Sequence, residues 1–102
     1  MGAITRGGNM GGHGVREQDM AMAAAIIELS HTPRMPRRHA RVARKLAGKV
    51  DGPEVDYAGS ANWWQNAEYL HEAANHLMCG GISLAHINAV VVMIYDSHYL
   101  EG

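Results

Sequence analysis

The segment from residue 36 to residue 50 constrains the fold most, because its charges repeat with the period of an α helix and not with that of a strand. At about 100° per residue, its Lys and Arg side chains fall on one arc of about 140°. Val42, Leu46 and Val50 fall together beside that arc. Pro36 suits the first helical position, and a Gly-Pro pair at positions 52 and 53 is a stop signal. We therefore expect a helix that docks by one edge and exposes its charge.

The charged residues are divided by sign along the chain. Up to residue 50 there are nine Lys and Arg and three acids, a formal charge of +6. Residues 51–102 contain seven acids and neither Lys nor Arg, a formal charge of −7, so the total of −1 hides two opposite halves. The cations that we expect to contact an anionic partner are Arg34, Arg37, Arg38, Arg41, Arg44, Lys45 and Lys49.

These seven cations allow two interpretations. Arg binds phosphate well because its planar guanidinium can donate two parallel hydrogen bonds, and each neutralised phosphate releases counterions. No Asn or Gln lies among the arginines, so the sequence does not predict recognition of bases. The other interpretation is a solvated face, or one paired with the acids of residues 51–72, in which each exposed pair contributes less than about 1 kcal/mol. We expect a nucleic-acid backbone or an acidic protein surface as the partner.

Two further segments have clear helical spacing. Residues 15–29 are apolar on two sides, which is typical of a buried helix, and we expect this helix at the centre of a bundle. Ser60 is a suitable N-cap for a helix over residues 61–79, which would end at a Gly-Gly pair. The apolar stripe expected on this third helix consists of Trp63, Ala67, Leu70, Ala74 and Leu77.

The segment from residue 83 to residue 99 carries two conflicting signals. It is rich in Val and Ile, which favour a strand. Its length and Ser83 at its start favour a helix, and a lone strand would have no partner in this chain. We interpret it as a buried helix. A chain of 102 residues forms one domain. The expected fold is all-α: a compact four-helix bundle over residues 15–102, preceded by a disordered Gly-rich leader over residues 1–14.

A second candidate site lies on the third expected helix. Glu68, Glu72 and His76 are four residues apart, so they share one ridge, and a Glu with a His could supply half of a metal site. That reading would make the protein a metal-dependent enzyme. The chain has only one such ridge and no zinc spacing, so an exposed polar face is the favoured interpretation. No nucleophile elbow, phosphate loop or dinucleotide fingerprint occurs, and we expect neither a cofactor nor an enzyme.

The remaining features bear on partners and location. Trp64 is a candidate interface residue, since Trp is enriched in binding hot spots. The seven Met and many Ala leave surfaces through which the chain could form a homodimer. A single Cys, no visible signal peptide and no apolar run long enough to span a bilayer lead us to expect a cytoplasmic protein outside membranes. We expect a small binding or regulatory protein; an inhibitor that occludes a partner's site is the alternative.

Overall fold

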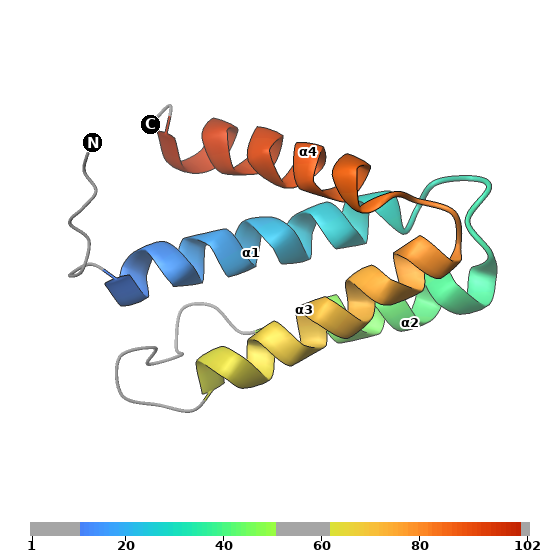
Figure 1. Cartoon of the computed structure of the whole chain (residues 1–102), viewed down its shortest axis with the longest axis horizontal. Helices are drawn as coiled ribbons and strands as arrows, with labels where there is room; N and C mark the ends of the chain where they lie inside the picture. The colour runs from blue at the N-terminus through green and yellow to red at the C-terminus, as the bar shows by residue number, and fades with distance from the viewer. Residues whose placement is uncertain (1–10, 51–61, 101–102) are drawn as a thin grey trace.

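The structure, a computed structural model, describes the backbone of residues 11–50 and 62–100 and the side chains of residues 17–50 and 65–98. Within these ranges the chain forms α1 (Gly11–Leu29), α2 (Arg37–Gly48), α3 (Asn62–Cys79) and α4 (Leu84–Tyr95), and a π-helical turn, η3 (Asp96–Leu100), continues α4 (Figure 1). The described residues include no strand. The expected all-α, four-helix bundle is confirmed.

The helix at the centre of the bundle is α1, as the sequence predicted. It packs against α2, α3 and α4, whereas α2 packs mainly on α3 and α4 mainly on α1. Both α2 and α3 lie on one side of α1 and α4 lies on the other (Figure 1). The helix begins at Gly11, four residues before the predicted start. Residues 1–10 lie outside the described ranges.

The packing of α2 depends on alanine. Ala40, Ala43 and Ala47 are buried, and the larger Leu46 and Val50 are only half-buried beside them. The sequence predicted that α2 packs through these larger residues. Its buried side chains are alanines instead, and their small size allows the backbone of α2 to approach α1 and α3 closely. The backbone before the helix is extended at Pro36, which occupies the N-cap position and not the first helical position that we predicted.

Two glycines end α3 as the sequence predicted. The N–H of Gly81 donates to the carbonyl of Met78 at 3.0 Å, and the N–H of Ile82 donates to that of Leu77 at 3.1 Å. This pattern satisfies the last carbonyls of a helix and requires a residue at positive φ, which Gly81 supplies at 105°. A Cβ at the preceding Gly80 would overlap the sulfur of Met35, which lies in the turn between α1 and α2.

The stripe that α3 buries is rotated from the predicted one. Ala67 was expected inside and is exposed. The side chain of Trp63 lies outside the described set. Among the described side chains of α3, the buried ones are Asn66, Leu70, Ala73, Ala74 and Leu77. Asn66 replaces an apolar residue at the start of this stripe, and its exposed fraction is only 4%.

The fourth element is a helix, despite its three consecutive valines. The hydroxyl oxygen of Ser83 accepts a hydrogen bond from the N–H of His86 at 3.1 Å, which caps the first turn. Ile87 is fully buried, and Val90 and Val91 pack partly buried against the core. Packing against α1 therefore overrides the strand preference of the valines. None of the described helices is both long and apolar enough to cross a membrane.

Candidate anion-binding surface on α2

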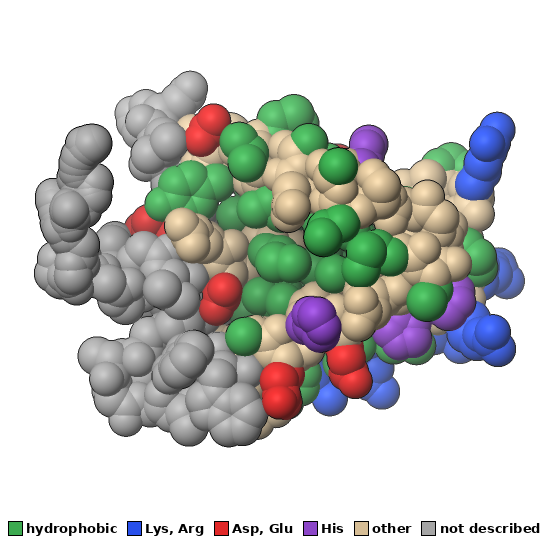
Figure 2. All heavy atoms as spheres, in the orientation of Figure 1, with side chains coloured by type: hydrophobic (Ala, Val, Ile, Leu, Met, Phe, Trp, Pro, Cys, Tyr) green, Lys and Arg blue, Asp and Glu red, His purple; other side chains and the backbone are tan. Residues whose placement is uncertain are grey.

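Five of the seven predicted cations form an exposed surface at the start of α2 and along it. None of the five forms an ion pair or hydrogen bond with a carboxylate in the part of the chain that the structure describes. Figure 2 shows Lys and Arg side chains at the right-hand end of the molecule, near the turn from α1 into α2, and also at its lower edge. We call these residues the basic face: Arg34, Arg37, Arg38, Arg41 and Lys45.

Helical geometry arranges three of these cations in a row. Arg37, Arg41 and Lys45 are each four residues apart, which places successive side chains one turn apart, about 6 Å along the axis. Arg38 lies beside this row on the helix, and Arg34 is exposed in the turn before the helix. The result is a line of cations with regular spacing. The four that belong to α2 are held by a helix backbone that is fixed from behind by buried alanines.

Arg44 was predicted to bind a partner, but it is engaged within the molecule. One of its terminal nitrogens donates to the carbonyl oxygen and to the hydroxyl oxygen of Ser30, both at 3.3 Å. Ser30 follows α1 directly, and its hydroxyl donates to the carbonyl of Ile27 at 2.6 Å. The guanidinium therefore lies at the C-terminal end of α1, where a cation stabilises the helix dipole. Arg44 joins α2 to α1.

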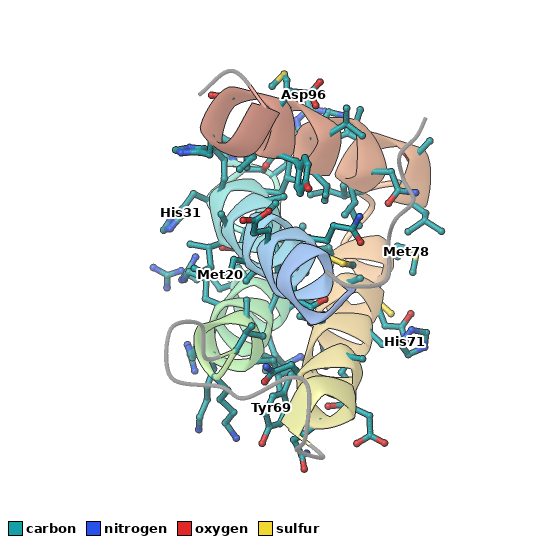
Figure 3. All side chains as sticks on the ribbon, turned by 90° about the vertical axis from the view of Figure 1, so that its left-hand side faces the viewer. Met20, His31, Tyr69, His71, Met78 and Asp96 are labelled. Atoms are coloured by element: carbon teal, nitrogen blue, oxygen red, sulfur yellow. The ribbon has the colours of Figure 1, made fainter. Side chains whose placement is uncertain are left out.

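Lys49 is also engaged, in this case with α3. Its ammonium nitrogen lies 5.2 Å from the centre of the Tyr69 ring, a distance typical of a cation–π contact. Tyr69 is half-buried, and Figure 3 shows it at the base of α2 and α3. This contact holds the end of α2 against α3. Lys49 and Arg44 thus differ from the basic face, although all seven cations come from one short stretch of sequence.

Two histidines form a contact between α2 and α3 that the sequence did not predict. The Nδ1 atoms of His39 and His76 are 3.0 Å apart, and the ring centres are 5.2 Å apart with an angle of 47° between the planes. One ring must donate an N–H and the other must accept it through a lone pair. Both rings are half-buried. The residues are 37 positions apart, and only the packing of α2 on α3 brings them together.

The structure does not bring the predicted metal ligands together. Within residues 17–50 and 65–98, no group of three or more His, Cys, Asp or Glu side chains could hold a metal ion. Glu68 and Glu72 are exposed and line a shallow depression on α3, whereas His76 directs its Nδ1 to His39. Trp64 lies on α3, but its side chain is outside the described set, so its role at an interface stays a prediction.

No family model matches the chain, and no curated protein or solved structure matches it either. The basic face is the feature with the clearest chemical preference, because it collects like charges that the described side chains leave without a counter-charge.

Proposed function

We propose that this protein binds the phosphate backbone of a nucleic acid through the basic face, as a small binding or regulatory protein and not as an enzyme. One observation carries the proposal: five exposed cations stand together with no carboxylate partner among the described residues. No intramolecular ion pair in this part of the molecule has to break before they bind phosphates. Arg supplies four of the five charges and can donate to phosphate through two parallel hydrogen bonds.

The spacing of the cations favours a nucleic acid over an acidic protein. Arg37, Arg41 and Lys45 repeat about every 6 Å along one line, which suits a polyanion with regularly spaced charges. Glu68 and Glu72 are exposed on the neighbouring α3 and would repel a polyanion that spread onto that helix. Contact is thereby restricted to α2 and the turn before it. The row contains no Asn or Gln, so we expect phosphate contacts without recognition of bases.

The test measures the affinity for a labelled duplex and a labelled single strand as the salt concentration changes. If all five cations neutralise phosphates, the plot of log K against log salt for a duplex has a slope of about −4.5. Replacing three of them in Arg37→Gln, Arg41→Gln and Lys45→Gln together should make that slope shallower by about 2.7. An unchanged affinity and slope in this triple variant would exclude the basic face as the site.

A matched pair of single variants separates a local contact from net charge. Lys45→Gln and Lys49→Gln each remove one positive charge from the same end of α2, but only Lys45 belongs to the basic face. We expect Lys45→Gln to make the slope shallower by about 0.9 and Lys49→Gln to leave it unchanged. Equal effects would indicate attraction by net charge alone. Binding of polyglutamate but not of either nucleic acid, with the same dependence on Lys45, would assign the surface to an acidic protein.

A further inference from the structure

The outer face of α4 carries no Lys, Arg, Asp or Glu and exposes apolar side chains in the part of the chain that the structure describes. From Leu84 to Tyr95 the helix contains no Asp, Glu, Lys or Arg. Its inner side packs on α1 through Ile87 and its neighbours, but Val92 and Met93 on the outer side are 57% and 63% exposed. Exposed apolar surface gathered on one helix face marks an interaction surface more often than scattered apolar residues do.

Four exposed residues give the outer face a heptad spacing. His86, Ala89, Met93 and Asp96 follow one another at steps of three, four and three residues, which aligns them in a single stripe. We call them the outer stripe. Asp96 is the first residue of η3, directly after α4, and Figure 3 labels it at the upper edge of the molecule. A stripe with this spacing is the pattern by which one helix packs along another.

We propose that the outer stripe pairs with the outer stripe of a second copy of this chain, in an antiparallel arrangement related by a two-fold axis. With the axis beside residue 91, His86 lies opposite Asp96 of the partner subunit, and Ala89 lies opposite Met93 of the partner subunit. Each contact occurs twice because a two-fold interface is self-complementary. An imidazole meets a carboxylate, and a small side chain meets a large one. In a parallel arrangement, Asp96 would face Asp96 of the partner subunit, and Met93 would face Met93 of the partner subunit.

The rest of the molecule is compatible with this pairing. The basic face belongs to α2 and the turn before it, and α2 and α4 lie on different sides of α1 in both views (Figures 1 and 3). A dimer through α4 therefore leaves both basic faces exposed. The pairing does not depend on the proposed function, and either one can fail alone. One helix pair is a small interface, so we expect a reversible dimer with a dissociation constant of roughly 10 to 100 μM.

Sedimentation equilibrium of the full chain between about 5 and 500 μM tests the pairing. The wild type should fit a monomer–dimer equilibrium. Met93→Glu should raise the dissociation constant at least about tenfold, because it places a carboxylate opposite Ala89 of the partner subunit. Leu84→Glu is the matched control, since Leu84 is also an exposed apolar residue of α4 but lies off the outer stripe. It should leave the constant within about twofold.

An exchange of two residues tests the register. Ala89→Met alone opposes two methionines and should weaken the dimer, as should Met93→Ala alone. The double variant that carries both changes restores a small residue opposite a large one, so it should recover wild-type association. A monomer at every concentration, a dimer unaffected by Met93→Glu, or a folded double variant that associates no more tightly than the single variants would overturn the pairing. Far-UV circular dichroism establishes that each variant is folded.

Discussion

Neighbouring cations of α2 have different surroundings because one residue step rotates the side chain by about 100°. Arg44 turns toward the end of α1 and donates to Ser30, whereas Lys45 is exposed to solvent on the basic face. One of the two adjacent charges therefore contributes to the stability of the fold and the other is available to a partner. A substitution at each position should consequently affect a different measurement.

We predict that Arg44→Gln lowers the free energy of unfolding by about 1 kcal/mol, because the carbonyl and hydroxyl of buried Ser30 lose a charged donor. Urea unfolding followed by circular dichroism measures this change. Arg41→Gln, at an exposed position of the same helix, is the control and should stay within about 0.5 kcal/mol of the wild type. Equal losses in the two variants would contradict a specific role for Arg44.

The sequence could not separate Arg44 and Lys49 from the five residues of the basic face. Their helical positions identify them as cations near one arc, but their partners, Ser30 and Tyr69, come from α1 and α3. The same limitation hid the contact between His39 and His76. These contacts depend on how the helices are rotated against one another, which the periodicity of a single segment does not determine.

Among the elements, the end of α3 depends most strongly on the absence of a side chain. The turn from α1 into α2 passes directly over Gly80, where an added Cβ would overlap the sulfur of Met35 and lie 3.1 Å from the Cδ of Pro36. Met35 is itself buried, so it has little room to move away. Gly48, at the end of α2, has no neighbouring atom within 4 Å of such a Cβ.

We predict opposite effects of alanine at these two glycines. Gly80→Ala should lower the free energy of unfolding by about 1 to 3 kcal/mol through overpacking. Gly48→Ala should raise it by about 0.4 to 1 kcal/mol, because alanine restricts the unfolded chain and favours the helix. The midpoint of urea unfolding, measured for each variant and the wild type, gives the direction and size of each change in stability. A stabilised Gly80→Ala variant would mean that the turn moves aside at little cost.

Local sequence signals predicted the ends of the helices well, but they predicted the buried faces of the helices less well. The helix over 62–79 begins within one residue of its predicted start, and both Ser83 and the glycines after α3 act as the caps that the sequence indicated. The start of α1 was predicted four residues too late, because the glycines at positions 11, 12 and 14 weigh against a helix. The exposed Ala67 shows that spacing defines a stripe but leaves its rotation uncertain.

At the scale of the whole molecule, the helices are unequally supported. Each of α1, α2 and α3 packs against the other two, whereas α4 packs mainly against α1 and contacts α3 only weakly. Ile87 is the only residue of α4 that is buried. Segments with few buried contacts open at lower free energy than the core. The fourth helix is therefore the part of the described structure that should detach first.

We predict that amides in residues 88–94 exchange with solvent at least about ten times faster, relative to their intrinsic rates, than amides in residues 23–29. Hydrogen exchange followed by mass spectrometry at low protein concentration measures the difference. Raising the concentration should slow exchange in α4 selectively if the proposed dimer forms, which gives the same experiment an internal control. Equal protection of the two segments in the dilute protein would show that α4 opens only with the whole domain.

The alanine contacts of α2 have a consequence for how this protein can change over time. Buried alanines attach the helix to its neighbours, with help from Arg44 and Lys49, whereas the side chains of the basic face are exposed to solvent. Separate positions of one helix therefore carry the packing contacts and the side chains that are available to a ligand. Substitutions among Arg37, Arg41 and Lys45 could tune affinity for a ligand, or abolish it, while the domain keeps its shape.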